Sequence, residues 1–163
     1  MKKKILPALV IVLVLIQFFH PEKNTADGVQ PNDISKVYPV SVEAQHILTA
    51  SCYDCHSNNT VYPWYNSIQP VAWWLNNHVE EGKRELNFNE FATYAPARQY
   101  KKMEELKEQI DEDEMPLSSY TLIHRDAILS EADKKILIRL SESVRDSLEA
   151  HYPADSLVIK KRS

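Results

Sequence analysis

Glycine is nearly absent from this chain: only Gly28 and Gly82 occur among its 163 residues. Tight turns between strands rely on glycine for positive φ angles, so a sheet-rich fold is disfavoured. Phosphate-cradling loops and dinucleotide-binding fingerprints each need several closely spaced glycines. The sequence therefore predicts a single all-α domain and argues against the common nucleotide-dependent activities.

Charged residues are unevenly distributed along the chain. Three of its 19 Lys and Arg residues lie at positions 2–4, whereas all 23 Asp and Glu residues follow position 20. An acidic domain repels the phosphate backbone, so nucleic acid is not expected as a partner. Opposite charge mainly speeds the encounter of two proteins, so a basic protein is a more suitable partner.

The first 20 residues form a separate hydrophobic segment. Three lysines precede an uncharged apolar run, residues 5–19, which is interrupted only by Pro7 and Gln17. This pattern is typical of an export signal. A 15-residue helix measures about 22 Å, which is short for a bilayer core of about 30 Å. Because no small-residue cleavage pattern follows, we favour an uncleaved membrane anchor over a removed signal peptide. Either alternative places the rest of the chain outside the cytoplasm, in the periplasm. In the favoured one, residues 5–19 anchor the protein in the inner membrane.

The remaining chain divides into a tether, a domain and a tail. Residues 21–40 are polar, contain three prolines and lack periodicity, so we expect an extended tether. Residues 41–152 have helical periodicity and form the predicted domain, and residues 153–163 form a tail. Four helices are expected around one core. Their features are a cap at Ser41 before Val42, Ala44, Ile47 and Leu48; a helix from Val71 to about Leu86; a helix from Ala97 to Ile110; and a capping box of Ser130 with Asp133 before Leu137, Leu140, Val144 and Leu148.

The chemistry of the chain is concentrated at Cys52-Tyr53-Asp54-Cys55-His56, which contains its only two cysteines. In a helical turn, residues three apart face the same side, so both thiols are expected to meet one flat ligand. The following histidine projects under the same face. This spacing suits a haem, because two thiols can add to porphyrin vinyl groups while the imidazole binds the iron. The motif therefore predicts one covalently attached haem c.

Three other interpretations of the cysteine pair are open. A zinc site needs four nitrogen or sulfur ligands, and no histidine elsewhere has a suitable spacing. A thioredoxin-like pair needs a βαβ context that a helical chain lacks. A structural disulfide is the third alternative for an exported protein.

The second axial ligand of the iron is predicted at Met115. Pro116 biases the residue before it towards an extended conformation, so Met115 is expected on a loop that reaches across the haem. The alternative is that Met115 only fills the core. Met103 has helical spacing that indicates packing, and His78 and His124 are rival nitrogen ligands.

Five stretches between about Val37 and Val144 form a recognisable pattern. They are Cys52-Tyr53-Asp54-Cys55-His56-Ser57-Asn58, Tyr62-Pro63-Trp64-Tyr65, Trp73-Trp74-Leu75 with His78-Val79, Met115-Pro116, and Leu129-Ser130-Glu131-Ala132. In these residues the chain resembles the bacterial haem-binding domain family of mono-haem c-type cytochromes. The resemblance implies a cytochrome c-like bundle, covalent haem at Cys52 and Cys55, and His56 as the proximal iron ligand.

The choice of axial ligand decides the expected function. With both axial positions filled, iron has no vacant site, so the protein would carry single electrons between redox partner proteins and would not be an enzyme. If Met115 does not bind, the alternative is a haem-based sensor or a peroxidase-like module with an open sixth position.

Two further clusters near the motif are interpreted structurally. Tyr62, Trp64, Tyr65, Trp73 and Trp74 are expected to pack against the haem edges. The acidic residues 111–114 precede Met115 and are expected to form either a solvated loop or a docking surface for a basic redox partner.

Overall fold

The computed structural model describes residues 2–26 and 28–159, and within these ranges it contains helices and no strand. The prediction of an all-α protein is therefore confirmed. The α-helices are α1 (Lys2–Ile16), α2 (Ile34–Val37), α3 (Val42–Ser51), α4 (Tyr53–His56), α5 (Val71–Glu85), α6 (Pro96–Asp111), α7 (Ser118–Thr121) and α8 (Glu131–His151). Short 3-10 helices are η1 (Trp64–Ser67), η2 (Phe88–Thr93), η3 (Arg125–Ala127) and η4 (Ala154–Ser156).

Two serine side chains determine where the first and last long helices of the domain begin. Ser41 Oγ accepts a hydrogen bond from the Ala44 amide at 3.1 Å at the start of α3. At the start of α8, Ser130 Oγ accepts from the Asp133 amide and Asp133 accepts from the Ser130 amide, which completes the predicted capping box. Each bond satisfies an amide that has no partner within its helix.

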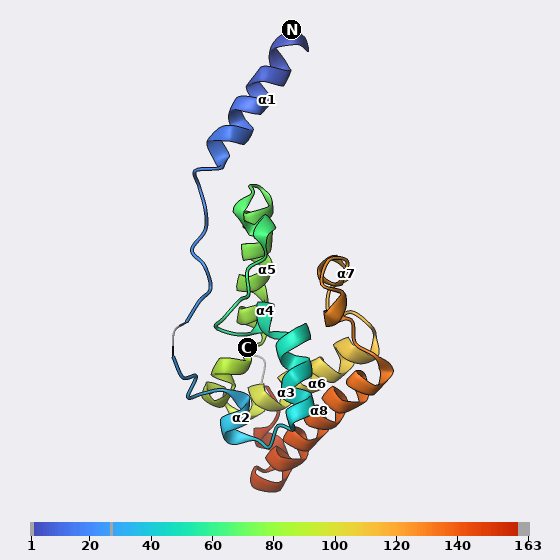
Figure 1. Ribbon diagram of the computed structural model, residues 1–163. Coiled ribbons are helices and arrows are strands. Elements are labelled where there is room, and N and C mark those ends of the chain that lie inside the picture. The colour runs from blue at the N-terminus through green and yellow to red at the C-terminus, as the bar shows by residue number, and fades with distance from the viewer. Residues whose placement is uncertain (1, 27, 160–163) are drawn as a thin grey trace.

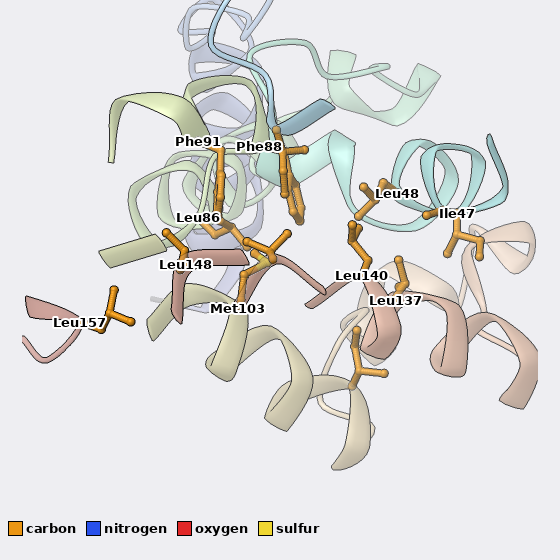
Figure 2. Packing of buried hydrophobic residues seen from close by; sticks show 14 residues of the cluster. Ile47, Leu48, Leu86, Phe88, Phe91, Met103, Leu137, Leu140, Leu148 and Leu157 are labelled. Atoms are coloured by element: carbon orange, nitrogen blue, oxygen red, sulfur yellow. The ribbon is translucent and has the colours of Figure 1, made fainter. Parts of the chain in front are cut away.

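The hydrophobic core lies between α3, α6 and α8 and the segment around η2 (Figures 1 and 2). The apolar stripe predicted for the last helix is buried, and α6 packs along α8 through Met103 and Ile110. Ser141 lies in the same interface and donates a hydrogen bond of 2.5 Å to the Met103 carbonyl. The largest buried apolar side chains are Phe88, Phe91, Ile34, Leu48, Met103, Ile110 and Leu137.

Helix α1 projects away from the helices of the domain (Figure 1). Its large apolar side chains from Ile5 to Leu15 are exposed on every side. In the part of the chain that the structure describes, no helix combines the length and the apolar character needed to cross a membrane.

The segment between α1 and α3, for which the sequence predicts a tether, follows the domain surface and contacts it. The Asn24 side chain donates to the Ser57 carbonyl and to Thr60 Oγ1, each at 2.9 Å. Asp33 caps α2 through the Ser35 amide, and Ile34 is completely buried. Asp33 and Ile34 are therefore packed against the domain, whereas residues 35–37 are exposed.

Candidate functional site

The Cys-x-x-Cys-His motif lies at a break between two helices. Helix α3 ends at Ser51, and Cys52 has a φ of −126°, so the chain turns before α4 begins at Tyr53. A hydrogen bond of 2.9 Å from the His56 amide to the Cys52 carbonyl holds the turn together. Cys52 therefore occupies the junction, and Cys55 and His56 lie on α4.

His56 is oriented by a backbone carbonyl. Its Nδ1 lies 2.8 Å from the carbonyl oxygen of Leu86, the residue that follows α5. A carbonyl only accepts hydrogen bonds, so Nδ1 carries the proton and the ring's lone pair lies on Nε2. Burial lowers the pKa of His56, and this exceeds the opposing effect of the backbone hydrogen bonds to Leu86 and Gly82. The side chain is thus a neutral imidazole with one nitrogen available to a metal.

Both cysteines are free thiols in a partly buried environment. Burial raises the pKa of Cys52 to about 12, with a smaller contribution from Cys55. Burial, followed by the nearby Asp54 carboxylate, raises the pKa of Cys55 to about 11. Neither thiol is ionised at neutral pH, which is unlike the low-pKa cysteines of redox-active pairs. Within residues 2–26 and 28–159, no three His, Cys, Asp or Glu side chains gather as a metal-ion site, so the zinc alternative gains no support.

A cavity of about 250 Å³ brings three of the four predicted site residues together. Cys52, His56 and Met115 all line it, and Cys55 does not. Its apolar wall consists of Leu86, Phe88, Leu106, Ile110, Pro116, Leu129 and Leu137. The volume is slightly below the range of roughly 300–1,000 Å³ that is common for ligand pockets.

The end of α6 places Met115 in the cavity. Helix α6 ends at Asp111, and Asp113 then adopts a left-handed conformation with a φ of 58°. Aspartate tolerates this conformation better than most residues do. The chain therefore folds back, and the Met115 amide donates to the Gln109 carbonyl at 3.2 Å. The sequence prediction of a loop position for Met115 is confirmed.

The rival ligands all lie outside the cavity lining. Met103 is fully buried in the core between α6 and α8. The His78 ring packs edge-on against Trp74, with their centroids 4.4 Å apart. His124 Nε2 is hydrogen-bonded to the Tyr65 hydroxyl at 2.8 Å, and its ring stacks on Tyr120.

Charged side chains line the rim of the cavity. Lys102 Nζ lies 3.0 Å from a carboxylate oxygen of Glu85 and 2.7 Å from one of Glu105, so this cation is flanked by two anions. In the acidic loop before Met115, Asp111 pairs with Lys107 at 2.6 Å and Asp113 pairs with Lys134 at 2.5 Å. Two of its four carboxylates are therefore already paired within the chain.

Two features of the site were missed from the sequence. The Leu86 carbonyl is a backbone group, so the residue type at position 86 does not indicate its role. Gly82 lets α5 approach the motif closely, because a Cβ at this position would lie 2.6 Å from the Cys55 carbonyl oxygen. The only sequence signal for Gly82 was its position as an isolated glycine inside a helical pattern, where alanine would be more favourable.

The structure places the five aromatic residues away from the cavity. None of Tyr62, Trp64, Tyr65, Trp73 and Trp74 lines it, and all three tryptophans are exposed. Trp64 and Tyr65 lie on η1, and Trp73 and Trp74 lie at the start of α5, whereas the cavity is lined by the motif, the end of α5 and later segments of the chain. Their packing against the haem edges stays a prediction.

Comparison with known proteins gives one result that agrees with this geometry. No curated protein and no solved structure matches the chain significantly. The model of the haem-binding domain family, however, matches residues 11–143, a range that contains the motif, the cavity and Met115. The chain therefore belongs to the haem-binding domain family.

Proposed function

We propose that the protein is a mono-haem c-type cytochrome that carries single electrons on the extracytoplasmic side of a membrane, to which residues 5–19 anchor it. The observation that carries the proposal is that Cys52, His56 and Met115 line one largely apolar cavity. The family supports haem binding. The covalent attachment, the electron-carrier role, the absence of enzymatic activity and the location are our inferences.

The donor set suits an iron porphyrin. Apolar side chains would surround the macrocycle, and Nε2 of His56 and the thioether of Met115 are the donors that would hold its iron. When bound, haem supplies a one-electron Fe(III)/Fe(II) couple, and thioether ligation favours the reduced form. His56 keeps its orientation during electron exchange because the Leu86 carbonyl holds Nδ1.

Covalent attachment would use the two thiols without any further reagent. Each thiol S–H would add across a vinyl group, so that sulfur would bond to one vinyl carbon and the hydrogen would move to the other. No group leaves and no electron is gained or lost. The thiols are protonated at neutral pH and therefore carry the hydrogen that this addition requires.

Attachment is tested with the protein produced in a host that has a haem-attachment system. We expect a coloured protein that keeps its pigment in acidified acetone. The double variant Cys52→Ala/Cys55→Ala is expected to release all pigment, and each single variant should keep a covalent bond through the remaining thiol. A colourless product, or a wild-type pigment that acidified acetone extracts, would contradict the proposal.

Axial ligation by Met115 is tested by absorption spectroscopy. The oxidised protein is expected to show a weak sulfur-to-iron band, and the reduced protein is expected not to bind carbon monoxide. Met115→Ala should abolish the band and allow carbon monoxide to bind, whereas Met103→Leu, a core variant outside the cavity, should leave both properties unchanged. Carbon monoxide binding by the wild-type protein would instead favour the sensor or peroxidase-like alternative.

A further inference from the structure

Exposed apolar side chains gather at one end of the domain. Trp64 is 78% exposed, Trp73 41%, Trp74 47% and Leu122 65%. We call this surface the apolar tip and define it by Trp64, Ile68, Trp73, Trp74, Leu122 and Ile123, which lie on η1, at the start of α5 and directly after α7.

Two segments distant in the sequence build the apolar tip, and contacts between them hold it together. The Tyr65 hydroxyl and His124 Nε2 lie 2.8 Å apart, which joins η1 to the segment after α7. The Tyr120 hydroxyl donates to Asp54 at 2.7 Å and connects α7 to the motif. Contacts of this kind do not cover the indole rings, so the apolar tip is a preformed exposed surface.

The segments that form the apolar tip lack charge. No Asp, Glu, Lys or Arg occurs between Asp54 and Glu80, or between Glu114 and Arg125, although 26% of the chain is charged. The polar side chains of these segments are amides, hydroxyls, the Cys55 thiol and three histidines, His56, His78 and His124. None of the six residues of the apolar tip carries a carboxylate for a basic protein partner, whereas tryptophan among polar groups is typical of residues at the boundary between lipid and water.

The apolar tip is also joined to the end of the exposed helix α1 (Figure 1). The Gln69 amide donates to Gln17 Oε1 at 2.9 Å, and Gln69 Nε2 donates to the Phe19 carbonyl at 2.7 Å. The Trp73 indole N–H donates to the same Phe19 carbonyl at 2.9 Å. An isolated helix that is apolar on all sides has no face suited to water. The apolar surroundings that α1 requires therefore begin next to the apolar tip.

From this continuity we propose that the apolar tip docks on the surface of a lipid bilayer. The inference rests on the membrane placement in the proposed function, and it adds that the domain is seated on the lipid and not held at a distance by a free tether. Helix α5 runs from the tip to the cavity rim over 15 residues, roughly 20 Å at about 1.5 Å per residue. Docking of the tip would thus hold the cavity about one helix length from the bilayer surface.

The experiment uses the three tryptophans, all of which belong to the apolar tip. The full-length, haem-loaded protein is reconstituted into phosphatidylcholine vesicles whose acyl chains are brominated close to the headgroups. Bromine quenches indole fluorescence on contact, so we expect about a twofold loss of emission relative to unbrominated vesicles. Quenching by haem is the same in both vesicle types and cancels in this ratio.

Two variants sharpen the measurement. Leu122→Asp/Ile123→Asp places charge in the apolar tip without altering a tryptophan, and it should largely remove the bromine-dependent loss. Val42→Asp, at an exposed apolar position on α3 away from the tip, should leave the loss unchanged.

Flotation of the vesicles separates the possible outcomes. If the protein floats with the vesicles and bromine does not alter its emission, the docking inference is overturned while the membrane placement stands. If the protein does not float, both are overturned. Neither result bears on haem attachment, which the acidified-acetone extraction tests separately.

Discussion

Replacing Gly82 by alanine tests how closely α5 must approach the cysteine motif. The new methyl group would lie 2.6 Å from the Cys55 carbonyl oxygen and 3.1 Å from its carbonyl carbon. These are backbone atoms, which cannot rotate away as the end of a flexible side chain can. Either α4 or α5 must therefore shift.

Two opposing effects determine the size of the change. Alanine in a helix interior is more favourable than glycine by about 1 kcal/mol. Overpacking a close contact costs about 1–3 kcal/mol. Because the contact is with backbone, we expect the upper part of that range and a net loss of about 1–2 kcal/mol, or roughly 2–8 °C in melting temperature for a chain of this size.

The Gly82→Ala change should also disturb the site itself. The Leu86 carbonyl that holds His56 Nδ1 lies four residues after Gly82 on the same backbone. A shift of α5 would lengthen this hydrogen bond and loosen the imidazole. We therefore expect a lower yield of haem-loaded protein together with the lower melting temperature.

The assay is thermal unfolding followed by circular dichroism, with pigment per polypeptide measured on the same samples. Asn77→Ala is the matched control, because Asn77 is exposed on the same helix and its replacement raises helix propensity without a clash. If Gly82→Ala stabilises the protein by as much as this control does, the proposed close contact has no energetic significance.

Three further perturbations have defined outcomes. Ser130→Ala should lower the free energy of unfolding by about 1 kcal/mol by removing the cap of α8. The hydrogen bonds from Ser130 lower the pKa of Asp133, so their stabilisation is present above the ordinary aspartate pKa and is lost as the pH falls through the pKa of Asp133 in the folded protein. The stabilities of wild type and variant should therefore converge in an acid titration. Ser141→Ala should lower the unfolding free energy measured in urea by about 1–2 kcal/mol, because the Met103 carbonyl loses its donor in the core; no change would mean that this bond is energetically neutral. Reversing the exposed acidic charge of Glu112 with Glu112→Lys should slow electron transfer from a basic redox protein severalfold at low ionic strength and little above about 0.15 M salt. A rate that is unchanged at low salt would exclude docking at this loop.

Much of the local structure was predictable because its causes lie within a few residues. The caps at Ser41 and Ser130 depend on amides three positions away, and both are present. The buried stripe of α8 repeats every three or four residues, so it follows from helical geometry alone. The loop position of Met115 follows from the proline after it.

The sequence indicated three residues that line the cavity, but it did not show that they lie together. The motif supplied Cys52 and His56, and the Met-Pro pair supplied Met115. Their convergence depends on the turn at Asp113 and on the packing of α6 against α8, which no spacing encodes. For the same reason, the absence of Cys55 from the cavity lining could not be foreseen: it follows from the break at Cys52 and the approach of Gly82.

By itself, the sequence determined the helical class, the ends of the helices and the set of groups able to hold a haem, because propensity, capping and donor chemistry belong to single residues and their near neighbours. Only the tertiary structure decided which of these groups share a cavity and which aromatic side chains remain exposed. Burial depends on what else fills the core, and that is a property of the whole chain. Trp64 therefore lies in the apolar tip and not beside the candidate haem site.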